Sequence, residues 1–308
     1  MKIINKDMKL YFSTYILFKT APLRLCAYLF RIKLISAILL TATLTLPAQT
    51  EMDVFSIPEN ERVLLDNFNK LYSEISDAEK DSLNSLIIDI FKSSLSLTES
   101  FFYPWPELDM IGKIRSDDML VNIFTWHILK KDNTYIYYGI IQYRLPSKRK
   151  EDKITVYLLT DKSSLIKQPE KEELTPDNWY GALYYSLSTH THRRKTWYVL
   201  LGFDFNNNFS NKKIIEILHF EKDKPLFGED IKTESGPVRR IIFEYSSNVV
   251  MALRFDDKLN QTVFDHLSPL EPIFKGFYRF YVPDGSYDAL RFYRGNFTLE
   301  RDVDARNY

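Results

Sequence analysis

The stretch Trp179–Phe220, WYGALYYSLSTHTHRRKTWYVLLGFDFNNNFSNKKIIEILHF, decides the fold. Its three runs rich in aromatic and β-branched residues are Trp179–Tyr185, Thr196–Phe205 and Ile214–Phe220, and its two polar connections are Thr189–Lys195 and Asn206–Lys212. Runs of this length joined by short polar turns are typical of antiparallel β-strands. We therefore expect a meandering sheet at the centre of the chain.

The same pattern extends from about Met119 to the C-terminus. The further expected strands are Met119–Leu129, Thr134–Leu145, Ile154–Leu159, Arg239–Tyr245, Val249–Phe255, Thr262–Leu267, Phe277–Tyr281, Tyr287–Arg294 and Phe297–Arg301. Pro283–Ser286 is expected to be a hairpin turn, because proline presets φ and the following glycine accepts positive φ. The polar segment Thr160–Asn178 is longer than ordinary connections and predicts a mobile loop.

Strands and helices do not alternate along the chain, so the pattern does not predict a parallel sheet with crossover helices. It predicts a mainly β fold, an antiparallel multi-stranded sheet system with a short N-terminal helical segment. The sheets are expected to form a curved sandwich or an open barrel. A partial propeller is the alternative, because hairpin-like units recur with an irregular period.

Two helices are expected before the strands, over Glu59–Ser73 and Asp77–Leu97. Ser76 or Asp77 provides an N-terminal cap for the second, in which apolar residues recur at spacings of three and four. These residues are Leu83, Leu86, Ile87, Ile90, Phe91 and Leu95. Such a stripe is typical of a packing face, so we expect a helical cap region, residues 49–109, to cover a sheet domain, residues 110–308.

Prolines interrupt the helical pattern in Phe101–Pro106, FFYPWP. Large aromatic residues at a joint between helices and sheet are expected to be mostly buried. The other interpretation is an exposed aromatic surface that holds a sugar ring or a protein partner. It makes Trp105 a candidate ligand-binding residue.

The first 48 residues differ from the rest of the chain. Seven Lys or Arg residues and one acid, Asp7, precede or flank an unbroken apolar stretch, Leu34–Leu46, which is followed by Ala48. This order is typical of a secretory signal peptide, and a stretch of 13 residues is short for a membrane span, which needs about 20. We expect residues 1–48 to be a signal peptide and the mature chain to reach the periplasm or cell envelope without a transmembrane span. A single N-terminal anchor is the alternative.

Removal of this leader changes the chemistry that the chain can offer. The only cysteine, Cys26, lies in it, so we expect a mature chain without disulfides, thiol nucleophiles or cysteine-ligated metals. Seven of the 41 basic residues and one of the 41 acidic residues leave with it, and the net charge becomes −6. A mildly acidic protein is a poor nucleic-acid binder, and we exclude that class.

Several phrases are similar to known proteins: KIRSDDMLVNIFTWHI, WYGALYY, TWYVLLGFD, RRIIFEYSSNVVMALRFDD, TVFDHLSP and VPDGSYDAL. Over most of Lys113–Asn307 the chain resembles a family of exported proteins of Bacteroidetes-type bacteria that are described only as hypothetical. The resemblance implies a signal-bearing N-terminus and a β-rich body. It implies no activity, ligand or catalytic residue.

His190 and His192 lie two residues apart, a spacing that puts both side chains on one face of an extended segment. Arg193 and Arg194 beside them repel a cation, and no nearby acid completes a metal site. We expect a solvated basic turn here, and neither a metal nor another cofactor. The two arginines can fork onto a phosphate or carboxylate, which makes them candidate ligand-binding residues.

The sequence has no Gly-x-Ser-x-Gly elbow, Walker motif, dinucleotide loop or His-Glu-x-x-His. Its many carboxylates include Asp204, Glu244, Asp265, Asp284 and Asp288, and a glycosidase needs two such groups across one cleft. The leading expectation is a non-enzymatic envelope protein that binds an envelope protein or a glycan through loops and exposed aromatics. A periplasmic glycan hydrolase with a carboxylate pair is the alternative, so whether the chain is an enzyme stays open.

Overall fold

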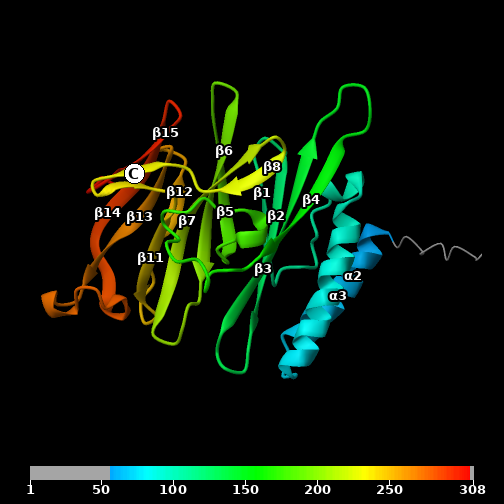
Figure 1. Ribbon diagram of the computed structural model, residues 1–308, viewed down its shortest axis with the longest axis horizontal. Helices are drawn as coiled ribbons and strands as arrows, with labels where there is room; N and C mark the ends of the chain where they lie inside the picture. Colours follow the sequence, from blue (N-terminus) through cyan, green and yellow to red (C-terminus); the bar gives the residue numbers. More distant parts are fainter. Residues whose placement is uncertain (1–55, 306–308) are drawn as a thin grey trace, which may run out of the picture. The chain divides into compact units, whose positions relative to one another are not determined.

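The computed structural model describes residues 56–305 (Figure 1). The predicted signal peptide, residues 1–48, lies outside these residues. Two helices, α2 (Ile57–Leu71) and α3 (Asp77–Leu95), precede the strands. Neither combines the length and the apolar character that a membrane-spanning helix requires.

The predicted capping of the second helix is confirmed. The Glu79 backbone N–H donates to the Ser76 hydroxyl, at 3.3 Å, and the Glu79 carboxylate accepts from the Ser76 N–H, at 3.0 Å. This reciprocal arrangement satisfies two donors that a helix N-terminus otherwise leaves free. A similar box joins Ser56 and Glu59 at the start of α2.

The strands form three sheets, and none of the sheets in the described residues closes on itself. The first has the order β1 (Gly112–Arg115), β2 (Val121–Leu129), β3 (Tyr135–Leu145), β4 (Lys153–Thr160). The second has the order β11 (Ile241–Ser246), β7 (Ser210–Glu221), β6 (Lys195–Asp204), β5 (Leu183–His192), and β8 (Lys224–Phe227) pairs with β7. The third has the order β10 (Gly236–Val238), β9 (Ile231–Thr233), β15 (Asn296–Glu300), β14 (Tyr281–Tyr293), β13 (Gln261–Pro269), β12 (Leu253–Asp256).

The elements stack in four layers: helices, first sheet, second sheet and third sheet, from right to left in Figure 1. Phe91 of α3 and Trp126 of β2 belong to the core between the helices and the first sheet. Ile123 of β2 and Leu200 of β6 belong to the core between the first and second sheets. The predicted helical stripe therefore covers a sheet, except for Leu86, which is exposed, and the fold is a stacked sandwich.

Strand β6 explains why the quoted stretch decides the fold. Successive side chains of a strand point to opposite faces. Tyr198 and Leu200 face the first sheet, whereas Trp197, Val199 and Leu201 face the third. A strand that is buried on both faces must be apolar at nearly every position, and WYVLLG meets this requirement.

The structure moves several predicted boundaries. Strand β5 continues to His192, so the expected turn Thr189–Lys195 is reduced to its centre. Pro283–Ser286 is not a hairpin turn: it lies inside β14, where the register against β13 shifts between Asp265 and Leu267. Extra residues of this kind form a bulge, which also accommodates proline.

The polar segment Thr160–Asn178 is fastened to the second sheet rather than free. Leu174 forms a β-bridge with Phe227 and is fully buried. The guanidinium of Arg240 donates to the carbonyl oxygens of Pro169 and Glu172. The structure also contains a parallel pair, β9 with β15, whereas the sequence pattern predicts only antiparallel hairpins.

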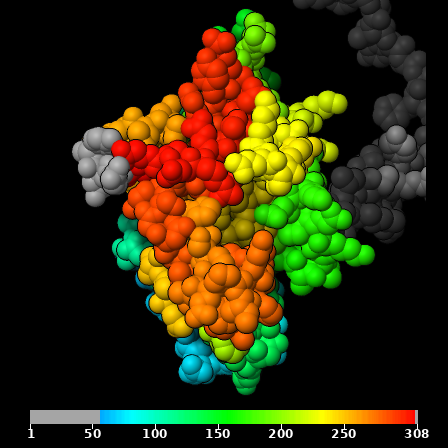
Figure 2. All heavy atoms as spheres, turned by 90° about the vertical axis from the view of Figure 1, so that its left-hand side faces the viewer, coloured from blue at the N-terminus to red at the C-terminus, as the bar shows by residue number. Residues whose placement is uncertain are grey.

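One long connection stands out from the sheets. Residues 270–280 join β13 to β14 and lie at the front of the face in Figure 2, in orange. Its exposed apolar side chains include Leu270, Ile273, Phe277 and Tyr278.

The described residues also contain short 3-10 turns: η1 (Thr98–Phe101), η2 (Pro176–Asn178), η3 (Pro272–Phe274) and η4 (Tyr278–Phe280).

Candidate functional site

A cleft opens beside the core that joins the first and second sheets. It has a volume of about 440 Å³, within the range of about 300–1,000 Å³ that is usual for small-molecule sites. The residues that line it come from the start of β3, the segment after β4, the approach to β5, and the β6–β7 hairpin: Thr134, Tyr135, Ile136, Tyr137, Asp161, Ser163, Ser164, Tyr180, Asp204, Asn206 and Lys212. We call it the Asp204 cleft.

Asp204 is the last residue of β6 and is only 7% exposed. The strand alternation that turns Tyr198 and Leu200 toward the first sheet also turns Asp204 that way. Its Oδ1 accepts hydrogen bonds from the Tyr137 hydroxyl, at 2.8 Å, and from the Asn206 backbone N–H, at 2.7 Å. The carboxylate is therefore held from both sheets.

Lys212 is the cross-strand neighbour of Asp204 in the β6–β7 pair. Its Nζ lies 3.6 Å from Oδ2 of Asp204 and donates a long hydrogen bond, 3.4 Å, to the hydroxyl of Tyr180. The first of these contacts is an ion pair without a direct hydrogen bond. Oδ2 and the ammonium are thus the less saturated polar groups of the cleft.

The environment favours protonation throughout this cluster. Burial raises the pKa of the Asp204 carboxyl above its usual value, although the ammonium of Lys212 opposes the shift. Burial alone lowers the pKa of Lys212, but Tyr180 and Asp204 outweigh it and the pKa rises. Burial and the Asp204 carboxylate raise the pKa of Tyr137, so its hydroxyl keeps its proton and donates.

The second carboxylate of the cleft is Asp161. Its Oδ1 accepts from the backbone N–H and the hydroxyl of Ser163, at 2.9 and 2.6 Å. Its Oδ2 accepts from the backbone N–H of Tyr137, at 3.0 Å. A Cβ atom at Gly181 would lie 2.5 Å from this carboxyl group, so only glycine fits there. Asp161 is fixed mainly by the protein's own donors.

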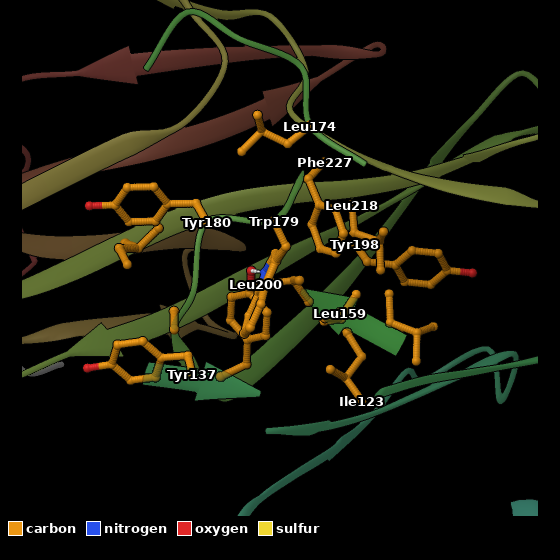
Figure 3. Packing of buried hydrophobic residues seen from close by; sticks show 14 of the residues in the cluster. Ile123, Tyr137, Leu159, Leu174, Trp179, Tyr180, Tyr198, Leu200, Leu218 and Phe227 are labelled. Atoms are coloured by element: carbon orange, nitrogen blue, oxygen red, sulfur yellow. Dashed lines mark hydrogen bonds between the residues drawn. The ribbon is translucent and has the colours of Figure 1, made fainter. Parts of the chain in front are cut away.

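Figure 3 shows how the tyrosines of this core are directed. The rings of Tyr137 and Tyr180 lie in the core, and both hydroxyls point to the same side. Tyr198 points to the opposite side. Tyr135 at the mouth of the cleft is stacked on Phe205, with ring centroids 4.8 Å apart. Apolar rings therefore surround a compact set of donors and acceptors.

This arrangement can bind a molecule that both donates and accepts hydrogen bonds. The carboxylate of Asp204 accepts, the ammonium of Lys212 donates, and the hydroxyl of Tyr180 does either. Hydroxyl groups of a ligand match all three roles. Two carboxylates near one cleft also satisfy one requirement of acid–base hydrolysis.

The predicted ligand residue Trp105 lies elsewhere, under helix α3. It is 1% exposed and packs against Phe91, with ring centroids 5.4 Å apart. It borders a smaller cavity, of about 240 Å³, and its Nε1 has no hydrogen-bond partner in the described part of the chain. The expected burial of this aromatic joint is confirmed for Trp105 and Phe101, whereas Phe102 is 51% exposed.

Arg193 and Arg194 form the turn between β5 and β6 and are exposed. Asp204 is the tenth and last residue of β6, so roughly 30 Å of extended chain separates it from this turn. The structure therefore does not bring the predicted residues together with the cleft. His190 in β5 is buried and hydrogen-bonded to Ser188, and residues 56–305 contain no cluster of three metal-ligating side chains.

The pattern that identifies Asp204 was present in the sequence. Asp204 lies an even number of residues after Tyr198 and Leu200 in β6, so its side chain is on the same, apolar face of the strand as theirs. Assignment of Lys212 to a turn concealed its pairing with Asp204, because the strand begins earlier, at Ser210.

No family model matches the chain, and no curated protein or solved structure matches it either.

Proposed function

We propose that the protein is an exported cell-envelope protein that binds a glycan fragment in the Asp204 cleft without transforming it. The observation that carries the proposal is the pair of buried Asp204 and half-buried Lys212, which lies beside two tyrosines whose hydroxyls point to the same side. The expected signal peptide and the resemblance to exported proteins supply the location. The proposed location therefore rests on the sequence alone.

A glycan suits the charge balance of the cleft. Asp161 already accepts three hydrogen bonds from the chain. The remaining charges of the cleft are the Asp204 carboxylate and the Lys212 ammonium, which have opposite signs and balance each other. A neutral ligand with many hydroxyls can bond to both without leaving either charge uncompensated. Aromatic rings beside such groups supply apolar contact for the carbon skeleton.

Hydrolysis is the second candidate, and one observation favours it. Asp204 has a raised pKa and shares its cleft with a second carboxylate, which is the environment of a general acid. We favour binding because the oxygens of Asp161 are occupied by Ser163 and Tyr137. A general base or nucleophile needs a lone pair that is directed at the substrate.

The test uses protein purified from a bacterial host that expresses the full chain. A glycan array identifies bound structures, and calorimetry measures affinity for Asp204→Asn and Lys212→Met. Loss of a hydrogen bond to a charged group is expected to weaken binding by about tenfold or more. Lys213→Met is the matched control, because Lys213 follows on β7, lies over the Tyr185 ring and does not line the cleft.

The outcomes separate the candidates. The absence of any glycan bound by the wild type would overturn the proposal, and so would an equal loss in Lys213→Met and Lys212→Met. Release of new reducing ends from the bound glycan, abolished by Asp204→Asn, would establish hydrolysis instead. Mass spectrometry of the same sample locates the N-terminus, which we expect near Gln49.

A further inference from the structure

A second cavity lies at the far end of β6, between two hairpin turns that are distant in the sequence. The β5–β6 turn, Arg193-Arg194, and the β14–β15 turn, Arg294-Gly295, project from the same end of their sheets in both Figure 1 and Figure 2. A Cβ atom at Gly295 would come within 3.2 Å of the His192 ring. The two turns are therefore in contact.

The cavity between them has a volume of about 440 Å³. It is lined by His192, Arg193, Lys195, Trp197, Arg294 and Gly295. We call it the two-turn pocket. Trp197 is 5% exposed, and the Nζ of Lys195 lies 4.9 Å from the centre of its ring. The pocket thus has an aromatic wall and a basic rim.

The positive charges of this pocket exceed the negative ones. The neighbouring carboxylate of Glu229 accepts from Lys195 Nζ, at 2.7 Å, and from Trp197 Nε1, at 2.6 Å. It therefore compensates Lys195. Within residues 56–305, neither Arg193 nor Arg294 forms an ion pair with a carboxylate. Two guanidinium charges remain for a ligand.

The backbone holds these arginines in a conformation that their side chains do not favour. Arg193, Arg194 and Arg294 have φ of 47°, 72° and 50°, the left-handed region in which glycine and asparagine are preferred. Lys222 and Asp223 adopt the same conformation in the β7–β8 turn, so strain by itself does not mark a site. What distinguishes this end is that arginines occupy both turns and border one pocket.

We propose that the two-turn pocket binds a phosphate group. Guanidinium groups form paired hydrogen bonds with phosphate oxygens, and an arginine from each of the two turns borders the same pocket. Ring and carbon atoms of the phosphate-bearing molecule contact Trp197. The phosphate group belongs either to a soluble phosphorylated molecule or to a lipid headgroup. This site is independent of the Asp204 cleft.

The test compares three asparagine variants of the full chain. Arg193→Asn and Arg294→Asn remove pocket charges, while Arg194→Asn is the matched control in the same turn, outside the pocket lining. Asparagine accepts the left-handed conformation, so the variants keep their turns and unfolding does not explain a loss. Urea unfolding of each variant checks this point.

Binding is measured by calorimetry with inorganic phosphate and a sugar phosphate, at two salt concentrations. A second arm uses sedimentation with phosphatidylcholine vesicles, with and without phosphatidic acid. We expect each pocket variant to lose about tenfold in affinity, the control to change little, and added salt to weaken binding. Binding in the first arm identifies a soluble ligand, and binding only to phosphatidic acid vesicles identifies a lipid headgroup.

Either binding result supports the proposal if Arg193→Asn and Arg294→Asn weaken it, and binding that neither variant weakens overturns it. The absence of binding in both arms overturns it. An equal loss in Arg194→Asn also overturns it, because the attraction would then come from general surface charge rather than from the pocket. A failure here leaves glycan binding in the Asp204 cleft unaffected, since the two cavities share no residue.

Discussion

The Nε of Arg240 lies 2.7 Å from Oε2 of Glu216, and both side chains are fully buried in the described structure. The same guanidinium also donates to the carbonyl oxygens of Pro169, Glu172 and Phe227. Arg240 thus joins β7, through its ion pair with Glu216, to the long segment after β4, through its hydrogen bonds to Pro169 and Glu172. The ion pair stabilises the arrangement only while both charges are present, because a single buried charge is costly.

Removal of one partner of this pair should destabilise the fold strongly. We expect Arg240→Met to lower the free energy of unfolding by about 3–5 kcal/mol, because Glu216 is then buried without compensation. Urea unfolding followed by circular dichroism measures the change. The control is Arg239→Met, whose ion pairs with Glu173 and Asp230 lie at the surface and contribute about 1 kcal/mol or less.

The double variant Arg240→Met with Glu216→Met provides a further check. Replacement of both partners by apolar groups should recover part of the loss, because no unpaired charge remains. A double variant as unstable as the sum of the two single variants would contradict the interpretation of a coupled pair.

His190 should make the protein less stable in acid. Burial among Phe255, Phe292 and Phe297 lowers the pKa of His190 from 6.5 to about 4. Between these values the unfolded chain binds a proton that the folded chain does not. The free energy of unfolding is therefore unaffected by His190 above pH 6.5. It decreases as the pH falls from 6.5 toward 4, by an amount on the order of 1–3 kcal/mol.

The measurement for His190 is urea unfolding on both sides of this pH window. The variant His190→Gln keeps a polar side chain of similar size and has no proton to gain, so its stability should fall less than that of the wild type. If both proteins lose the same free energy, another group is responsible for the acid sensitivity.

Gly181→Ala should disturb the Asp204 cleft through Asp161. The added Cβ lies 2.5 Å from the Asp161 carboxyl group, which must move and lose hydrogen bonds to Ser163 and Tyr137. We expect a loss of about 1–3 kcal/mol in stability, typical of overpacking. In a chain that already carries Asp161→Ala the same change should cost clearly less, and an unchanged cost would assign the effect to another contact.

Trp105 should prove to be a structural residue. Because it is buried against Phe91 and Phe124, Trp105→Ala is expected to cost about 3–5 kcal/mol in unfolding free energy. The exposed neighbour gives the control, since Phe102→Ala removes fewer contacts and should cost much less. Retained glycan binding in Trp105→Phe would show that this residue is not the ligand contact that the sequence suggested.

The helices and the strand-rich body were predictable because their signals are local. The capping box of Ser76 and Glu79 and the alternation in β6 each depend on residues close in the chain. The bulge at Pro283–Ser286 was misread as a turn, because the same residues suit both and only the register against β13 decides between them.

Local patterns in the sequence were enough to predict a mainly β chain with N-terminal helices, and all residues after Cys26 are free of cysteine. The export signal expected in residues 1–48 stays a prediction. These properties follow from composition and from periodicity over a few residues. Only the three-dimensional arrangement brings Asp204 to Tyr137 and places Arg193 and Arg294 at the border of one pocket. Pairing between distant strands and packing between sheets place these residues together, and no local pattern encodes which sheet lies against which.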